Sequence, residues 1–221
     1  MNTINTTRDG ARIYSPLLLS LYDTLIMKVL SPYVWRCPPR HFVDLYRRCM
    51  TPNHADVGVG TGYVLDRCAY LPGQVRIGLF DLQQHCLDYC ARRLARFQPE
   101  TYQCDALAPI EVNAARFDSI ALGGILHCIP GDMAAKGAVF DAIAPLMHAR
   151  TTVFGYTILN QGVTKTIASR ITYFLLKQLK VINGPDDSAQ QLKQALAQRF
   201  RSTEVTVIGC VALFTAHTPV H

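Results

Sequence analysis

The sequence predicts an α/β fold in which a doubly wound, largely parallel sheet carries helices on both faces. Short apolar runs alternate with segments of helical periodicity through the first five predicted strands, and this alternation is typical of parallel sheets. Two final apolar stretches, over about 203–208 and 210–216, are separated only at Gly209-Cys210. Such a tight reversal predicts an antiparallel hairpin at the end of the sheet.

Two helices are expected before the first strand. The apolar segment over residues 15–31 has Pro16 near its start and Pro32 after its end, and proline is common at both kinds of helix boundary. Pro38-Pro39 then interrupts the chain before a second helix over about 40–50. The sheet is therefore expected to begin only after this helical segment.

The first two strands are expected on either side of a glycine-rich turn and a helix. The run over 53–58 is short and apolar, and the helical pattern after its glycines stops at Pro72-Gly73. A second apolar run over 75–80 ends at Asp81. In the segment over 83–97, apolar residues recur at i, i+3, i+4 and i+7, which predicts an amphipathic helix.

The later elements repeat this alternation. Ser188 and Gln191 have the spacing of a capping box, which predicts the start of the last helix, and Asn183-Gly184-Pro185 breaks the chain before it. The expected strands span about 101–104, 118–122 and 151–157, and the expected helices about 132–148, 161–181 and 188–200.

Composition supports one large domain, or a domain with a small appendage, in the 221 residues. A hydrophobic content of 49% with 17% charged residues predicts a substantial core and excludes global disorder. The net charge of +6 is scattered along the chain rather than gathered in a block. This pattern favours a solvated basic surface over a nucleic-acid interface.

The eight cysteines include no C-x-x-C pair, so neither a zinc ribbon nor a redox motif is indicated. No secretory signal is recognised, and reduced cysteines in a cytoplasmic protein are the simpler expectation. The apolar stretch from Ile13 to Trp35 is interrupted by Asp23 and Lys28. A membrane span needs about 20 largely uninterrupted apolar residues, so this stretch is not expected to be one.

The most informative motif is a glycine loop that follows Asp56. Glycines alternate at Gly58, Gly60 and Gly62, between a buried strand and a helix start, where a backbone can lie directly against a nucleoside-type ligand. The dinucleotide pattern G-x-G-x-x-G would need a glycine at the position of Tyr63. The chain instead reads D-x-G-x-G-x-G, so the spacing argues against a dinucleotide.

This motif resembles motif I of the class I S-adenosylmethionine-dependent methyltransferases that act on small molecules. In that family the loop, here Asp56 to Gly62, passes under the methionine part of the cofactor. The resemblance covers roughly residues 40–217 and implies a Rossmann-like seven-stranded sheet with the order 3-2-1-4-5-7-6. It also implies an N-terminal helical lid over residues 1–40 and an S-adenosylmethionine-binding domain over residues 41–221.

Further cofactor contacts are expected at the carboxyl ends of successive strands, where open α/β sheets bind ligands. Asp81, nineteen residues after the last loop glycine, can accept hydrogen bonds from both ribose hydroxyls, although a helix-capping role stays open. The resemblance implies that Leu82 lies against the adenine and that Asp105, with Ala106 beside it, meets the adenine amino group. It places Gly123, at the family's motif IV, near the sulfonium.

His127 is the acid–base candidate, because histidine titrates near neutral pH and can take a proton from a hydroxyl or an ammonium. A structural histidine between two apolar neighbours is the alternative. Substrate contacts are expected from Tyr14 and Tyr22 of the lid, from Arg36, and from Tyr156 at the far end of the fifth strand. Aromatic side chains of this kind favour a sulfonium through cation–π attraction.

The function that the resemblance implies is in-line methyl transfer from S-adenosylmethionine to a small-molecule acceptor, on oxygen or nitrogen, in a setting such as secondary metabolism. Positioning of the nucleophile can then account for much of the rate. Two alternatives are an NAD(P)-dependent oxidoreductase and a methyltransferase-like protein that binds without catalysis. No metal spacing, nucleic-acid module or membrane span is recognised, and a homodimer stays open.

Overall fold

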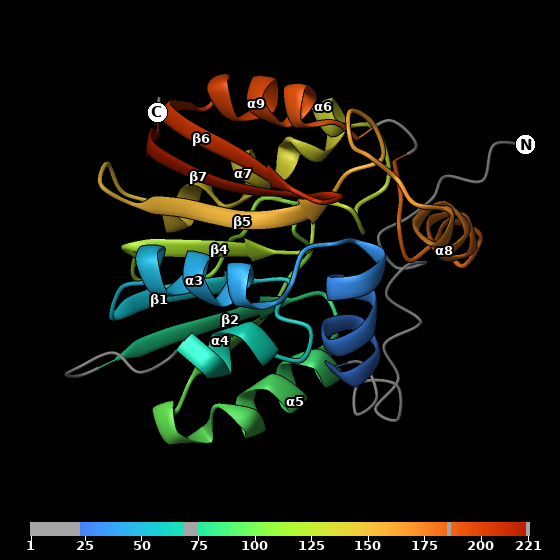
Figure 1. Ribbon diagram of the computed structural model, residues 1–221. Coiled ribbons are helices and arrows are strands. Elements are labelled where there is room, and N and C mark those ends of the chain that lie inside the picture. Colours follow the sequence, from blue (N-terminus) through green and yellow to red (C-terminus); the bar gives the residue numbers. More distant parts are fainter. Residues whose placement is uncertain (1–22, 69–74, 185–186, 220–221) are drawn as a thin grey trace, which may run out of the picture.

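The computed structural model describes residues 23–68, 75–184 and 187–219 (Figure 1). Seven strands form one sheet with the order β3-β2-β1-β4-β5-β7-β6, which confirms the predicted topology. β7 runs antiparallel to β5 and β6, while the other neighbours are parallel. The strands are β1 Asn53–Val57, β2 Arg76–Asp81, β3 Glu100–Gln103, β4 Ser119–Gly123, β5 Thr152–Ile158, β6 Phe200–Ile208 and β7 Val211–Pro219.

Burial along the strands follows their place in the sheet. The central strands β1, β2, β4 and β5 are buried over almost their whole length, as expected for parallel strands covered on both faces. In the edge strand β3, half-buried and exposed residues alternate, and the edge strand β6 exposes most of its residues. The hairpin reverses at Gly209-Cys210, as predicted, although both of its strands are longer than the sequence suggested.

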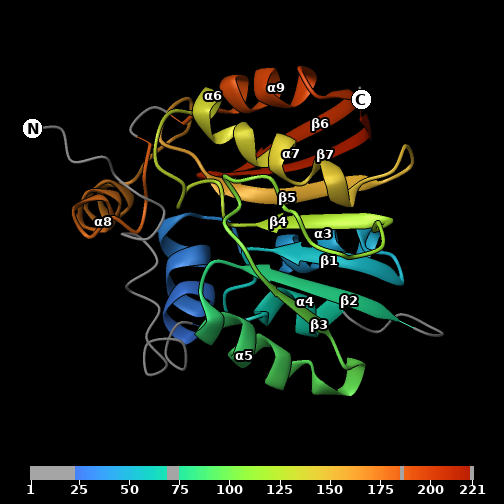
Figure 2. The same ribbon diagram turned by 180° about the vertical axis from the view of Figure 1, so that it is seen from behind.

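Two helical layers enclose two apolar cores. Helices α3, α4 and α5 cover one face of the sheet, and α6, α7 and α9 cover the other, as Figures 1 and 2 show. The α-helices are α3 Arg40–Cys49, α4 Tyr63–Cys68, α5 Gln84–Arg93, α6 Met133–Lys136, α7 Ala138–Ala142, α8 Ile167–Gln178 and α9 Ala189–Ala197. In addition, η1 Asp23–Val34 is a π-helix, and η2 Ala95–Phe97 and η3 Ala144–Leu146 are short 3₁₀ turns.

The prediction of one helix over 132–148 is wrong, because α6, α7 and η3 occupy this segment. Asp132 caps α6 by accepting a hydrogen bond from the Ala135 N–H at 2.8 Å, and Gly137 separates α6 from α7. Pro145 then stands in the first turn of η3. Glycine has low helix propensity and proline lacks the N–H that would continue an α-helix, so the apolar periodicity persists without one continuous helix.

Two other helix boundaries differ from the prediction. The helix expected from residue 161 begins at Ile167, where Thr166 accepts a hydrogen bond from the Ser169 N–H, because Gly162 adopts a positive φ of 69° before it. The segment predicted over 83–97 divides into α5 and the 3₁₀ turn η2. The capping box of Ser188 and Gln191 at α9 is confirmed.

The N-terminal helix η1 lies at the edge of the sheet where the parallel strands end (the blue helix in Figure 1). It is π-helical and continues through Pro32 to Val34, so the predicted end before the proline is wrong. The Trp35 N–H bonds to the Leu30 carbonyl, five residues earlier, at 2.8 Å. No helix in the described ranges is long and apolar enough to cross a bilayer.

Candidate active site

A pocket opens along the edge of the sheet where the parallel strands end. Its lining runs across the sheet from the loop after β3 to the start of β7, and includes residues of η1 and α3. This is the edge at which α/β proteins with this winding bind ligands. The pocket therefore has two parts, one at β1, β2 and β3 and one at β4, β5 and β7.

The glycine loop forms the first part. Gly58, Gly60 and Gly62 all adopt positive φ, at 76°, 50° and 67°, which side chains rarely tolerate. A Cβ on Gly62 would lie 2.5 Å from Sγ of Cys90 in α5, whereas one on Gly60 would meet nothing within 4 Å. Gly62 thus permits close packing against α5, while Gly60 faces open space in the pocket.

Asp81 ends β2 beside this loop. Its carboxylate accepts a hydrogen bond from the Gln83 N–H at 2.9 Å and one from the Gly60 N–H at 3.4 Å. Burial raises the pKa of Asp81, although these backbone donors oppose the shift. Gln83, not Asp81, occupies the cap position of α5. The carboxylate therefore lies in the pocket lining with a preorganised backbone around it.

Asp56 lies in β1 and lines the same part of the pocket, almost fully buried. The Tyr46 hydroxyl donates a hydrogen bond to its Oδ2 at 3.1 Å. Burial raises the pKa of Asp56 to about 7; the charge of Asp81 adds to the shift, and the bond from Tyr46 opposes it. A cationic group bound nearby would favour the ionised carboxylate.

The loop after β3 supplies the far end of this part. Leu82, Asp105 and Ala106 all line the pocket. Oδ1 of Asp105 accepts a hydrogen bond from the Leu107 N–H at 2.9 Å, which fixes the turn that presents this carboxylate. The three residues expected near an adenine are therefore brought to one end of the pocket.

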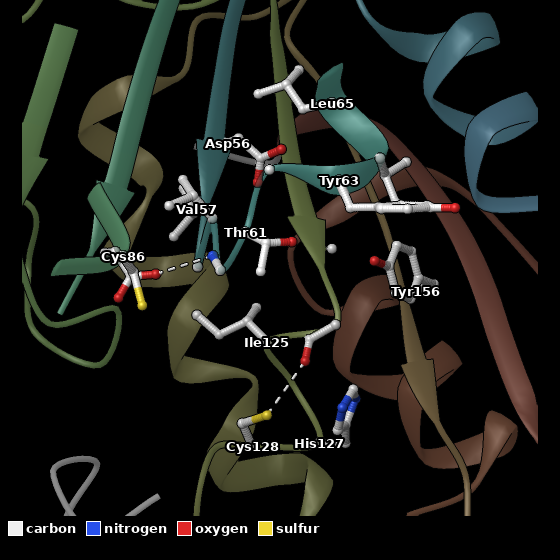
Figure 3. A pocket seen from close by; sticks show the side chains of 18 of the residues that line it. Asp56, Val57, Thr61, Tyr63, Leu65, Cys86, Ile125, His127, Cys128 and Tyr156 are labelled. Atoms are coloured by element: carbon white, nitrogen blue, oxygen red, sulfur yellow. Dashed lines mark hydrogen bonds between the residues drawn. The ribbon is translucent and has the colours of Figure 1, made fainter. Parts of the chain in front are cut away.

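The second part centres on the Gly123-Gly124 turn after β4. A Cβ on Gly123 would collide with the Tyr46 hydroxyl, and one on Gly124 would lie 3.3 Å from the Tyr156 ring and 3.4 Å from Cε1 of His127. Figure 3 shows His127 and Tyr156 on the same side of the pocket, with Ile125 between them and the glycine loop. These glycines let the side chains of Tyr46, Tyr156 and His127 approach the backbone closely.

His127 is held in a defined state. Its Nδ1 accepts a hydrogen bond from the Ile158 N–H at 3.3 Å and lies 3.5 Å from Oγ1 of Thr157. Because Nδ1 is the acceptor, the proton of the neutral ring sits on Nε2. Burial, together with the positive charge of Lys136, lowers the pKa of His127 to about 3. His127 is therefore neutral near pH 7 and a hydrogen-bond donor through Nε2.

An aromatic wall completes the second part. The rings of Phe42 and Tyr156 stack with centroids 4.0 Å apart and planes inclined by 13°, and Trp35 lines the pocket near the end of η1. Ile26, Met27 and Ser31 of η1 also line the pocket. This half of the pocket is thus mainly apolar and flat-sided.

Not every predicted residue is brought to the pocket. The side chain of Arg36 is exposed, and Arg36 does not belong to the described pocket lining. Tyr14 and Tyr22 lie outside the described residues. All the other residues predicted for the site line the pocket, namely Asp56, Gly58, Gly60, Gly62, Asp81, Leu82, Asp105, Ala106, Gly123, His127 and Tyr156.

Sequence reasoning missed Tyr46 and Phe42, which α3 contributes to the pocket. Both lie on the apolar face of that helix, so their periodicity indicated core packing and gave no functional signal. Ile125 and Cys128, beside the Gly-Gly turn, were missed as well. In the described residues, no group of three or more His, Cys, Asp or Glu side chains could hold a metal ion.

The residues present fit S-adenosylmethionine. The open backbone at Gly60 leaves room for a ligand, Asp81 offers a carboxylate for ribose hydroxyls, and Asp56 offers a buried carboxylate for a cation. The aromatic wall and the pocket-lining side chains of η1 belong to a separate, mainly apolar part of the lining. Two ligands can therefore be placed side by side without using the same residues.

Comparisons with known proteins agree with this arrangement. No family model matches the chain. The chain is 32% identical over 210 residues to a demethylluteothin O-methyltransferase of Streptomyces thioluteus, covering 95% of this chain and 91% of that protein. It is 31% identical over 221 residues to a physcion biosynthesis cluster O-methyltransferase of Aspergillus chevalieri, covering 99% of each.

The fold has a close match among solved structures. The N-methyltransferase NodS of Bradyrhizobium japonicum, solved with S-adenosyl-L-homocysteine, superposes with a TM-score of 0.63 at 13% identity, covering 99% of this chain and 100% of that one. Likeness at this identity shows the fold, and the curated relatives above show the family. With its sheet order, its glycine loop and these relatives, the chain belongs to the S-adenosylmethionine-dependent methyltransferases.

Proposed function

We propose that this enzyme methylates a hydroxyl oxygen on a small, planar, conjugated molecule of secondary metabolism. The observation that carries the proposal is the aromatic wall of Trp35, Phe42 and Tyr156 beside the Gly123-Gly124 turn. Flat apolar walls favour flat apolar ligands, because offset stacking adds about 0.5–1.5 kcal/mol per ring pair beyond the area that is buried. The two O-methyltransferase relatives support oxygen as the methylated atom.

The cofactor contacts follow the first part of the pocket. Asp81 accepts hydrogen bonds from the ribose hydroxyls, Leu82 packs on the adenine, and Asp105 with Ala106 meets the adenine edge. The backbone of Gly58, Gly60 and Gly62 passes along the methionine portion, Asp56 faces its ammonium, and Gly123 lies near the sulfonium. The positions of all these residues in the pocket lining support the assignment.

The chain's own residues then have two tasks. When bound, S-adenosylmethionine supplies an electrophilic methyl group, so the protein needs to orient the acceptor oxygen and exclude water. His127 donates from Nε2 to that oxygen, and Tyr156 and Phe42 hold the plane of the acceptor. A ring with a pKa of about 3 is a weak base at pH 7, so a donor role fits His127 better than proton removal.

The acceptor hydroxyl must in that case release its proton readily to water, and its oxygen then takes the methyl group as the methyl–sulfur bond breaks. Conjugation with a carbonyl lowers the pKa of a phenol or enol, and the N–H of a neutral imidazole stabilises the oxyanion.

We further assign residues 1–40 to a lid segment and residues 41–221 to the cofactor-binding domain. The side chains of η1 that line the pocket support the first part of this division. The eight free cysteines suit a reducing, cytoplasmic setting.

An isotope-transfer experiment tests the function. The enzyme is incubated with S-adenosylmethionine labelled at the methyl group and with matched pairs of naphthols and naphthylamines, with and without an adjacent carbonyl. We expect label on the oxygen of the carbonyl-bearing naphthols, identified by mass spectrometry and NMR. Label found only on nitrogen would contradict the choice of oxygen. Binding of S-adenosylhomocysteine with no transfer to any acceptor would support a non-catalytic protein instead.

A pair of aspartate variants supplies the control. Asp81→Ala removes the proposed ribose contact, and Asp88→Ala removes an exposed carboxylate of α5 that does not line the described pocket. Losing hydrogen bonds to a charged group costs about 1.5–3 kcal/mol, so Asp81→Ala should weaken cofactor binding about 10-fold or more. Asp88→Ala should bind as the parent does. Tight binding of NAD by the parent would favour the oxidoreductase alternative.

A further inference from the structure

The first residue of η1 is tied to the cofactor loop by a closed polar network. Oδ1 of Asp23 accepts a hydrogen bond from the Thr61 hydroxyl at 2.6 Å, and Oδ2 accepts one from the Arg93 guanidinium at 2.6 Å. Arg93 also donates to the Thr61 carbonyl at 2.8 Å. Each of the three residues therefore contacts the other two, although they come from η1, the glycine loop and α5.

This network joins the parts of the molecule that must cooperate to hold the cofactor. Thr61 lies between Gly60 and Gly62 and is buried. Arg93 lies at the end of α5, on the same helix as Cys90, whose Sγ leaves no room for a side chain on Gly62. Asp23 begins the helix whose Ile26 and Met27 line the pocket, one turn further on.

The low exposure of the Asp23–Arg93 ion pair indicates that it holds η1 in place more strongly than a surface ion pair would. Exposed ion pairs contribute little to stability, because water screens them and long side chains lose conformational freedom. Here the side chains of Asp23 and Arg93 are only 15% and 21% exposed, and both carboxylate oxygens are engaged. Charge-assisted hydrogen bonds with this shielding are stronger than neutral ones. A negative charge in the first turn of η1 also interacts favourably with the helix dipole.

We propose that Asp23 and Arg93 are positioning residues that clamp η1 onto the cofactor loop through Thr61, and that this clamp sets how long the cofactor stays bound. Because η1 lines the pocket, ligand exchange at the glycine loop requires this helix to move, and movement breaks the bonds of Asp23. The clamp acts on retention of the cofactor and leaves the methyl-transfer step to the residues around His127. The proposal rests on the cofactor site assigned above.

The sole tryptophan of the chain provides a direct readout. Trp35 lies just beyond the end of η1 and lines the pocket, so its fluorescence reports on both cofactor binding and the position of η1. Stopped-flow displacement of S-adenosylhomocysteine would give its dissociation rate in the parent, in Asp23→Ala, in Arg93→Ala and in the double variant. Asp66→Ala is the matched control, because the Asp66–Arg96 pair, at 2.7 Å, joins α4 to η2 without contacting η1.

We expect each single variant to release S-adenosylhomocysteine about 10-fold faster or more, which corresponds to the loss of one charge-assisted hydrogen bond. The double variant should release it little faster than either single one, because the residues act through one network. The KM for S-adenosylmethionine should rise with kcat preserved at saturation. Asp66→Ala should match the parent. Thr61→Ser should retain slow release, whereas Thr61→Val should lose part of it.

Two results would overturn the clamp. One is a dissociation rate in Asp23→Ala and Arg93→Ala equal to that of Asp66→Ala. The other is fully additive effects in the double variant, which would mean that the two residues act independently. Both require a parent that binds S-adenosylhomocysteine, so they differ from failure of the cofactor assignment, in which the parent itself would not bind. Thermal unfolding of each variant identifies a global loss of stability as the cause of any change.

Discussion

The hydroxyl of Tyr46 donates to Oδ2 of Asp56 at 3.1 Å, inside the part of the pocket assigned to the cofactor. This bond stabilises the ionised form of Asp56, which burial makes unfavourable, and the resulting pKa is about 7. Near neutral pH the free enzyme is therefore a mixture of protonated and ionised Asp56. A cationic ligand shifts that mixture toward the carboxylate, so binding is coupled to proton release.

Cofactor affinity should consequently fall as the pH drops below 7. Below its pKa, Asp56 must lose a proton for each cofactor bound, which costs up to about 1.4 kcal/mol per pH unit. Calorimetry at pH 6 in two buffers of different ionisation enthalpy should detect roughly one proton released per site. Asp56→Asn should release none. Equal proton release from the parent and from this variant would remove Asp56 from the linkage.

The role of His127 can be tested by matched substitutions. Gln places an N–H donor near the position of Nε2, whereas Ala removes the donor. If His127 orients the acceptor oxygen by donation, His127→Gln should keep most of kcat and His127→Ala should lose about 10-fold, the worth of one hydrogen bond to a charged group. A base role predicts equal loss in both. With a pKa of about 3, the parent's kcat should show no histidine titration between pH 5 and 8.

Acid sensitivity should come in part from His54. This residue is fully buried in β1, its Nδ1 lies 2.9 Å from Oγ of Ser119, and burial lowers its pKa to about 3. The unfolded chain binds a proton below about pH 6.5 while the folded chain does not, so stability falls as the pH drops through that window. Between pH 6.5 and 5 the loss is about 2 kcal/mol. Urea unfolding of His54→Asn should show a correspondingly flatter pH dependence.

The buried ion pair between Lys136 and Asp187 should matter more than any surface pair. Both side chains are almost fully buried, and the pair joins α6 to the segment before α9. Lys136→Met removes the buried cation beside this carboxylate and should cost about 3–5 kcal/mol in the free energy of unfolding. Asp141→Ala, which breaks the Arg199–Asp141 pair, in which the aspartate side chain is 55% exposed, should cost under about 1 kcal/mol. Similar losses in chemical denaturation would contradict this ranking.

The strands could be predicted from the sequence because strand burial and the final reversal at Gly209 are local signals, whereas the strand order came from the family resemblance. Helix continuity could not be predicted as well. The periodicity over 132–148 reports which face is buried, but Gly137 and Pro145 decide where the helix divides. The π-helical path of η1 through Pro32 also had no local signal. It shows only once the chain on both sides of the proline is placed.

Some pocket residues could likewise be found from a local sequence signal, whereas others depend on the tertiary fold. Asp81 and Asp105 could be found because each follows a strand end, and strand ends meet at one edge of the sheet. Asp23 and Arg93 are 70 residues apart, and neither belongs to a motif, so their contact depends on how η1 folds back across the loop. Tyr46 is similar, since an aromatic residue on the buried face of a helix usually indicates core packing.

Trp35, just after η1, and the β6–β7 reversal at Gly209-Cys210 meet beside the acceptor half of the pocket. The Cys210 N–H donates to the Trp35 carbonyl at 2.8 Å, and a side chain on Gly209, which adopts a φ of 59°, would collide with that same carbonyl. During synthesis on the ribosome, η1 therefore gains this anchor only after residue 210 has been made. The contact spans most of the chain, so closing it carries a large entropic cost and places completion of the pocket late in folding.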